Sequence, residues 1–190
     1  MPVPDSAPVT VLIVEDEPPL ADLYAGWLED TYEVHTAYDG ETALEMLEGV
    51  DVVLLDRRMP GLSGDEVLEY IQERELPCHV ALVTAVEPEF DIVDMGFDLY
   101  LTKPISRLEL RSAVERLSAR RHYSDTLREY FEMGAKKSAL EANKTRDTLE
   151  SNPEYAALCD RLESLRQDLD ETVDVMADED WEFLWQSLED

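Results

Sequence analysis

The stretch that most constrains the fold is a short apolar run that ends in a carboxylate. Residues 52–55 are Val-Val-Leu-Leu, and Asp56 follows them directly. A run that is apolar on both faces is typical of a strand buried in a parallel sheet. Burying an unpaired charge is costly, so Asp56 should lie in a crevice that offers a cation or strong donors. Ligands of open α/β sheets bind in the crevice outside the carboxyl ends of the strands, which makes Asp56 the candidate reacting group.

Strands and helices alternate along the first 121 residues. The predicted strands cover residues 9–14, 32–37, 52–56, 79–84 and 98–101. A helix follows each of them, and the first is expected over 18–30 with one apolar face, formed by Leu20, Leu23, Tyr24 and Trp27. The last begins at a capping box, Ser106 to Glu109. This order predicts an α/β fold, a doubly wound five-stranded parallel sheet of the flavodoxin type.

A polar side chain follows most of these strands at the point where the strand ends. The residues are Glu15, Asp16, Asp56, Thr84 and Lys103. A single carboxylate after a strand is often only a helix cap, and a single lysine is usually solvated. Five such residues at the same edge of one sheet instead predict a common site.

These residues resemble the receiver domain of two-component response regulators. The resemblance covers residues 9–121 and rests on four motifs, which are Glu15-Asp16, Asp56 with Met59-Pro60-Gly61, Thr84-Ala85 and Tyr100-Leu101-Thr102-Lys103-Pro104. It implies that a sensor histidine kinase donates a phosphoryl group to Asp56. It also implies a Mg²⁺ site made of Asp16, Asp56 and the backbone carbonyl of Arg58, with Glu15 acting through water.

The same resemblance assigns the other site residues. Lys103 supplies a point charge to the phosphoryl oxygens, and Thr84 supplies a hydroxyl donor once phosphate has arrived. The shift of Thr84 is coupled to an aromatic switch, here Tyr100. Residues 85–95 are shorter than usual for the family and contain Pro88, so we expect a short, frayed or displaced fourth helix.

An enzymatic alternative is an aspartate-nucleophile phosphatase of the haloacid dehalogenase type. Such enzymes carry a second aspartate two residues after the nucleophile, as the acid or base. Arg58 occupies that position here. We therefore expect a phosphoacceptor rather than an enzyme, with at most self-phosphorylation and self-dephosphorylation.

Residues 122–190 predict an all-α hairpin or short coiled coil. A first helix is expected over 123–149, and a second begins at Pro153 with Asn152 as its cap. The second helix carries a heptad seam, formed by Tyr155, Leu158, Leu162, Leu165, Leu169 and Met176. The aromatic segment 181–188 is expected to fold back on the hairpin, or else to dock on a partner.

This region resembles the HalX domain that follows receivers in haloarchaeal proteins. The motifs that carry the resemblance are Tyr130-Phe131, Lys136-Lys137, Leu140-Glu141, Glu154-Tyr155 and the leucines after them. The family brings no secure molecular activity, so the resemblance leaves the output of the protein open.

Charge indicates the environment of the protein. With 45 acidic and 16 basic residues the formal net charge is -29, which predicts a halophilic protein that salt must screen. Two cysteines fit a reducing compartment, and no stretch reaches the roughly 18 apolar residues of a membrane span. Residues 1–8 are expected to be a disordered lead rather than a signal peptide. These features predict a cytoplasmic protein with no membrane contact.

Three of the four lysines, Lys136, Lys137 and Lys144, lie within nine residues. They either pair with acids of the neighbouring helix or form a contact surface for an acidic partner such as DNA. Residues 122–190 nevertheless carry 7 basic and 19 acidic residues, the opposite of the basic footprint of DNA readers. We therefore expect signalling by protein interaction, with a homodimer left open and DNA-binding transcriptional regulation as the alternative.

Overall fold

The computed structural model describes residues 8–88, 92, 93 and 95–186, with side chains as far as residue 173. The predicted lead, residues 1–8, lies outside this range apart from Pro8. The chain divides into two compact units, Met1–Ser118 and Ala119–Asp190. Each unit is described by itself below.

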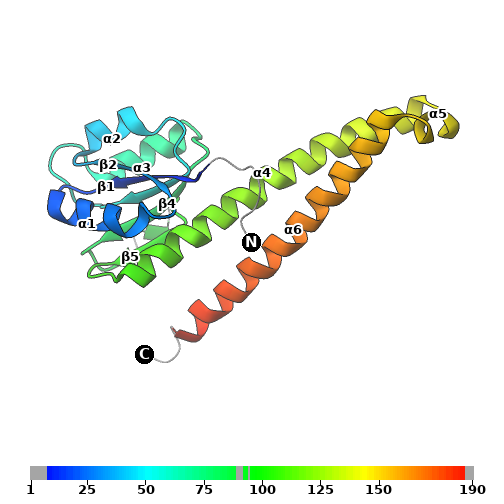
Figure 1. Ribbon diagram of the computed structural model, residues 1–190. Helices are drawn as coiled ribbons and strands as arrows, with labels where there is room; N and C mark the ends of the chain where they lie inside the picture. The colour runs from blue at the N-terminus through cyan, green and yellow to red at the C-terminus, as the bar shows by residue number, and fades with distance from the viewer. Residues whose placement is uncertain (1–7, 89–91, 94, 187–190) are drawn as a thin grey trace. The chain divides into compact units, whose positions relative to one another are not determined.

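The first unit is built on a five-stranded parallel sheet. Its strands are β1 (Thr10–Val14), β2 (Glu33–Ala37), β3 (Val52–Leu55), β4 (His79–Thr84) and β5 (Leu99–Thr102). Their order in the sheet is β2-β1-β3-β4-β5, so β1 and β3 are neighbours at the point where the winding reverses. All four pairings are parallel. The predicted flavodoxin-type architecture is confirmed (Figure 1).

Alternate side chains of each central strand enter two separate cores, one on each face of the sheet. On β1, Leu12 and Val14 pack in one core, while Val11 and Ile13 pack in the other. The helices α2 (Gly40–Met46) and α3 (Gly64–Glu73) cover the first face. The helix α1 (Pro18–Leu28) and the first turns of α4 (Arg107–Asn143) cover the second. Because both faces are covered, the strands are apolar throughout.

The first helix differs from its prediction in length and in its buried face. It ends at Leu28, and its fully buried side chains are Ala21, Tyr24 and Leu28. Leu23 is 47% exposed, so the predicted apolar face is not buried along its whole width. Tyr24 and Trp27 do contact each other, with ring centroids 5.5 Å apart. The small Ala21 lets the helix approach the sheet closely. The sequence prediction looked for large apolar residues and therefore did not include Ala21.

The segment between β4 and β5 contains no α-helix in its described residues. Ile92 and Val93 form part of a 3₁₀ turn, and residues 89–91 and 94 lie outside the description. The expectation of a reduced fourth helix is consistent with this finding. Proline at position 88 removes a backbone donor where a helix would need one.

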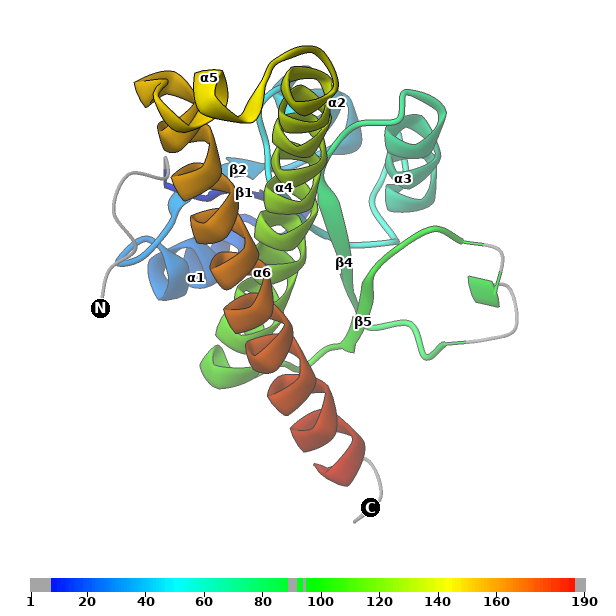
Figure 2. The same cartoon turned by 90° about the vertical axis from the view of Figure 1, so that its right-hand side faces the viewer.

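The second unit is a helical hairpin. The later part of α4 and the helix α6 (Pro153–Gln186) run side by side in opposite directions, with α5 (Arg146–Glu150) at the turn (Figures 1 and 2). The side chain of Asn152 accepts hydrogen bonds from the backbone N–H groups of Glu154 and Tyr155, at 2.8 and 3.0 Å. The predicted cap of α6 is therefore confirmed.

Two details of the hairpin differ from the sequence prediction. The helix expected over 123–149 is broken, because α4 ends at Asn143 and α5 begins after its own cap, Thr145. The backbone of residues 181–186 continues α6 instead of folding back. The side chains of Met176 and of the aromatic segment lie outside the description.

No helix of the described residues has an apolar stretch long enough to cross a membrane.

Candidate functional site

The carboxyl ends of β1, β3, β4 and β5 bring the predicted polar residues to one edge of the sheet. Backbone hydrogen bonds extend β1, β3 and β5 by one residue each. The N–H of Asp56 donates to the Val14 carbonyl at 3.0 Å, and the N–H of Lys103 donates to the Thr84 carbonyl at 2.8 Å. Parallel register therefore places Asp56 beside the end of β1 and Lys103 beside the end of β4.

Lys103 joins two carboxylates that are 88 and 47 positions away in the chain. Its Nζ donates to Glu15 Oε2 and to Asp56 Oδ2, each at 2.5 Å. The side chains of Lys103, Glu15 and Asp56 are 12%, 3% and 10% exposed. Charge-assisted hydrogen bonds between such desolvated groups are stronger than those between neutral groups. Lys103 is therefore a fixed cation of the site.

Three carboxylates lie at this place, two more than this single cation can neutralise. Carboxylate oxygens of Glu15, Asp16 and Asp56 all lie within 4.8 Å of one another, and Glu15 Oε1 is buried without a hydrogen-bond partner among the described residues. A hard divalent cation such as Mg²⁺ prefers this kind of oxygen donor set, completed by water. The residues present fit a Mg²⁺ ion.

Two buried groups of this cluster, Glu15 and Lys103, have shifted pKa values. Burial raises the pKa of Glu15 above its ordinary value, although the hydrogen bond and the charge of Lys103 act against the shift. Burial alone would lower the pKa of Lys103, but its bonds to Asp56 and Glu15 outweigh burial and raise it. Lys103 therefore stays protonated over the whole physiological range.

The turn after β3 fixes the carboxylate of Asp56. Its Oδ1 accepts a hydrogen bond from the backbone N–H of Arg58 at 3.1 Å. Gly64 opens α3 directly beneath it, and a Cβ atom on that glycine would overlap the Asp56 backbone carbonyl. Only glycine allows this close approach.

Arg57 is a site neighbour that sequence reasoning missed. It follows Asp56 directly yet is only 7% exposed, and its guanidinium binds Asp65 of α3 through two hydrogen bonds of 2.9 and 3.0 Å. The pair fixes the start of α3 against the turn that carries Asp56. An arginine and an aspartate eight residues apart occur too often in sequences for this spacing to predict a buried ion pair.

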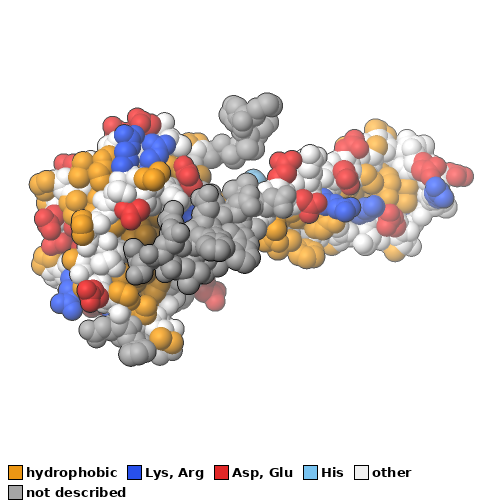
Figure 3. Space-filling view, turned by 90° about the horizontal axis from the view of Figure 1, so that it is seen from below, with side chains coloured by type: hydrophobic (Ala, Val, Ile, Leu, Met, Phe, Trp, Pro, Cys, Tyr) orange, Lys and Arg blue, Asp and Glu red, His pale blue; other side chains and the backbone are white. Residues whose placement is uncertain are grey.

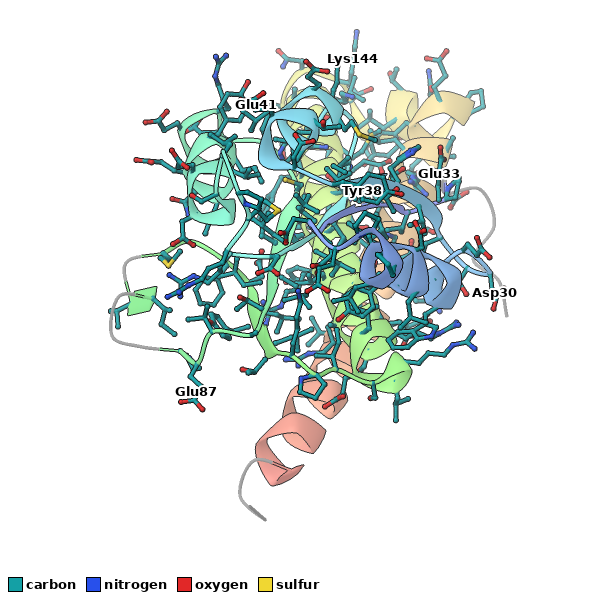
Figure 4. The ribbon with its side chains drawn as sticks, turned by 90° about the vertical axis from the view of Figure 1, so that its left-hand side faces the viewer. Asp30, Glu33, Tyr38, Glu41, Glu87 and Lys144 are labelled. Atoms are coloured by element: carbon teal, nitrogen blue, oxygen red, sulfur yellow. The ribbon has the colours of Figure 1, made fainter. Side chains whose placement is uncertain are left out.

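Thr84 and Tyr100, the predicted switch residues, are linked through a loop. Thr84 is 1% exposed, and its Oγ1 lies 3.4 Å from the backbone N–H of Val86. The Tyr100 hydroxyl donates to the carbonyl of the same Val86 at 2.8 Å, and Phe97 packs edge-on against the Tyr100 ring. The next residue, Glu87, points away from the sheet into solvent (Figure 4). Val86 therefore connects the two side chains.

The three clustered lysines lie in the hairpin, in the second unit. Lys137 pairs within α4 with Glu141, at 3.9 Å. Lys136 and Lys144 have no ion pair among the described side chains, and Lys144 extends outward from the end of α4 (Figure 4). Among the described side chains none of the three forms an ion pair with an acid of α6, although Lys144 and Glu154 line the same pocket, so both interpretations of these lysines stay predictions.

Comparison with protein families decides the class of the chain. The model of the response regulator receiver domain matches residues 11–115, and that of the HalX domain matches residues 119–184. The chain belongs to the response regulator family. It consists of a receiver domain followed by a HalX domain, as the motifs predict.

Known relatives agree with this assignment. A protein of Haloferax volcanii, provisionally named a transcriptional regulator, is 47% identical over 164 residues. The match covers 85% of this chain but only 28% of that relative, so this chain spans little more than a quarter of its length.

Solved receiver structures share the fold. A signal receiver domain from Vibrio parahaemolyticus is 27% identical with a TM-score of 0.60, and the match covers 64% of this chain and 98% of that one. A response regulator from Thermotoga maritima, solved in complex with Mg²⁺-BeF, is 34% identical with a TM-score of 0.50, covering 57% and 98%.

Proposed function

We propose that the receiver domain accepts a phosphoryl group on Asp56 from a sensor histidine kinase. The observation that carries this proposal is the arrangement around Asp56. Its carboxylate is fixed on one side by Lys103 and on the other by the Arg58 N–H, and it lies in an acidic cluster that fits Mg²⁺. Asp56 is 8% exposed, which leaves a small opening toward the donor.

The transfer needs an oxygen nucleophile and charge neutralisation, and little else. A carboxylate oxygen of Asp56 attacks the phosphorus of a phosphohistidine, an O–P bond forms, and the P–N bond to imidazole breaks. The product is an acyl phosphate on Asp56. Lys103 already contacts Asp56 Oδ2, so its charge needs only a small movement to reach a phosphoryl oxygen.

Asp16 and Asp56 would hold Mg²⁺ together with the Arg58 backbone carbonyl, and Glu15 would act through water. Bound there, the ion would neutralise charge on the transferred phosphoryl group. The Thermotoga maritima relative was solved with Mg²⁺-BeF, which supports the choice of metal. The unpartnered Glu15 Oε1 supports the role of Glu15.

Thr84 and Tyr100 would report the phosphorylated state. A phosphoryl group on Asp56 adds acceptor oxygens at the end of β3, and the neighbouring strand β4 ends in Thr84. Rotation of the Thr84 hydroxyl toward these oxygens would remove its 3.4 Å contact with Val86 and disturb the carbonyl that Tyr100 binds. A local charge change would then become a change of the receiver surface.

Phosphorylation can be tested directly with a small phospho-donor and Mg²⁺. The chain should gain one phosphoryl group by intact-mass measurement, and Asp56→Asn should abolish the gain. Asp30→Asn is the matched control, because Asp30 is an exposed aspartate of the same unit whose ion pair among the described residues is with the exposed Arg107. Equal phosphorylation of wild type and Asp56→Asn would contradict the site assignment.

For the output, we propose that the HalX domain signals by protein interaction. The net acidity of residues 122–190 opposes DNA phosphates. DNA binding is the second candidate, because the Haloferax volcanii relative carries a regulator's name. The test compares promoter enrichment with protein capture, using phosphorylated chain in molar KCl. Promoter enrichment that a Lys136→Ala/Lys137→Ala/Lys144→Ala variant loses would favour the DNA candidate.

A further inference from the structure

The turn between β3 and α3 is closed by contacts between Arg57 and the start of α3. The backbone carbonyl of Arg57 accepts a hydrogen bond from the Gly64 N–H at 3.0 Å. The guanidinium donates from Nε to Asp65 Oδ1 at 2.9 Å and from Nη2 to Asp65 Oδ2 at 3.0 Å. Two parallel bonds of this kind fix both the distance and the orientation of the two side chains. Residues 57–65 therefore form a loop whose ends are joined through main chain and side chain.

The burial of Arg57 is a reason to ask what this ion pair does. Figure 3 shows charged side chains of both signs on the surface of the described residues, among apolar ones. Arg57 is instead only 7% exposed. Removing a charge from water has a cost that a single ion pair often fails to offset, so such a pair is weak evidence for stability. A buried ion pair can instead specify one conformation of the chain.

The conformation of this loop determines the position of the Arg58 backbone. The Arg58 N–H donates to Asp56 Oδ1 at 3.1 Å, and the Arg58 carbonyl is the backbone ligand proposed for Mg²⁺. The Arg58 side chain is exposed, so its own burial does not hold the backbone in place. On one side of it lies Arg57, bound to Asp65, and on the other lies Met59, which is buried in a core of the sheet. The two neighbours therefore hold the peptide group that carries the carbonyl.

Asp65 is a suitable anchor because the start of α3 is itself well fixed. The Ser63 hydroxyl accepts from the Glu66 N–H at 3.3 Å, and the Ser63 N–H donates to Glu66 Oε2 at 2.9 Å. Gly64 approaches the preceding turn so closely that a Cβ atom on it would lie 2.9 Å from the Arg57 Cα. The Asp65 side chain is nevertheless 46% exposed, so it can be substituted without opening a cavity in the core.

We propose that the Arg57–Asp65 pair positions the Arg58 carbonyl and thereby favours Mg²⁺ over a larger divalent cation such as Ca²⁺. This inference rests on the proposed Mg²⁺ site and extends it to two residues outside the ligand set. Mg²⁺ requires nearly ideal octahedral geometry with ligands at about 2.0–2.1 Å, whereas Ca²⁺ accepts flexible geometry with ligands at about 2.3–2.6 Å. A carbonyl that is free to shift by about 0.3 Å could therefore still bind Ca²⁺ but would bind Mg²⁺ poorly.

Isothermal titration calorimetry on the full 190-residue chain tests this proposal. Mg²⁺ and Ca²⁺ are titrated separately, at constant KCl and without phospho-donor. Asp65→Asn should raise the dissociation constant for Mg²⁺ about tenfold, a usual loss when a group that orients a ligand is removed. The constant for Ca²⁺ should rise by no more than about threefold. Losing a nearby charge weakens both divalent ions alike, so the ratio of the two constants reports the geometry.

Two further variants separate geometry from charge. Arg57→Lys keeps the net charge but loses the paired hydrogen bonds of the guanidinium, so it should change the ratio in the same direction as Asp65→Asn. Asp65→Glu keeps a carboxylate and should restore most of the Mg²⁺ affinity. Asp30→Asn is the matched control, because it changes the net charge equally and breaks an exposed arginine–aspartate pair of the same unit. It should leave the ratio unchanged.

The possible outcomes distinguish this inference from the proposed site. Equal losses of Mg²⁺ and Ca²⁺ affinity, or no loss in either variant of the pair, would overturn the inference and leave the proposed site intact. A wild type that binds neither ion, or an Asp16→Asn variant that binds Mg²⁺ as tightly as wild type, would refute the proposed site and the inference with it. Circular dichroism identifies a variant that fails to fold. If Arg57→Lys does so, the half-exposed position of Asp65→Asn still gives the ratio.

Discussion

Neutralising Asp16 should stabilise the metal-free protein and abolish its response to Mg²⁺. In the site, three carboxylates share the single cation Lys103, and Lys103 bonds to Glu15 and Asp56 but not to Asp16. Asp16 therefore contributes repulsion without a direct partner when the metal is absent. Asp16→Asn removes this repulsion and also removes a charged ligand of the ion.

The magnitude follows from the geometry. Two unit charges at the upper limit of 4.8 Å for these carboxylate oxygens repel by about 3.5 kcal/mol at an effective dielectric constant of about 20. Asp16 is half-buried, and the attraction of Lys103 opposes the repulsion, so we expect a gain of about 1–2 kcal/mol in the free energy of unfolding. Wild type should instead gain about 1.4 kcal/mol when Mg²⁺ is present at ten times its dissociation constant.

Urea denaturation at constant KCl, with EDTA or with Mg²⁺, measures both effects. Asp160→Asn is the matched control, because Asp160 is an exposed aspartate of α6 whose loss changes the net charge equally. The stabilisation by Asp16→Asn in EDTA should exceed that of the control by about 1 kcal/mol or more. A variant that is less stable than wild type in EDTA, or that still gains stability from Mg²⁺, would refute the reasoning.

Three further predictions concern the fold. Gly64→Ala should lower the free energy of unfolding by about 3 kcal/mol, because the new Cβ overlaps the Asp56 carbonyl. In the same denaturation assay Gly26→Ala, whose Cβ meets no atom within 4 Å, should raise it by up to about 1 kcal/mol. Asn152→Ala should remove about 1 kcal/mol by exposing two N–H groups at the start of α6, measurable as faster amide exchange there. With a net charge of -29, the thermal midpoint should rise between about 0.1 M and 1 M KCl, as the Debye length falls from about 10 Å to about 3 Å; an unchanged midpoint would contradict the halophile interpretation.

The sequence predicts the sheet and the meeting of Glu15, Asp56 and Lys103 well, because both follow from strong local signals. A buried parallel strand is a continuous apolar run, and the edge at which it ends is fixed by the direction of the chain. The position of a polar residue after such a run therefore determines where it lies, with no knowledge of side-chain packing.

The features that the sequence does not predict depend on packing. Burial of Arg57 depends on the approach of α3, and burial of Ala21 instead of Leu23 depends on how closely α1 approaches the sheet. The break after Asn143 did have a local signal, since the Thr145 hydroxyl caps α5 by accepting from the Thr148 N–H. The helical pattern of apolar residues continues on both sides of this break, so the pattern alone predicts one unbroken helix.

The placement of the four lysines also determines how the protein reacts with amine-directed reagents. Lys103 is the lysine of the receiver, and its amine is held as an ammonium ion between two carboxylates. Acylating reagents and protein acetylation need the free amine, and the raised pKa of Lys103 makes this form scarcer than in an ordinary lysine. Lys136 and Lys144, with no ion pair among the described side chains, remain reactive. Dyes or surface linkers attached through lysine side chains will therefore collect on the hairpin in preference to the phosphoacceptor site, where the Lys103 side chain is only 12% exposed.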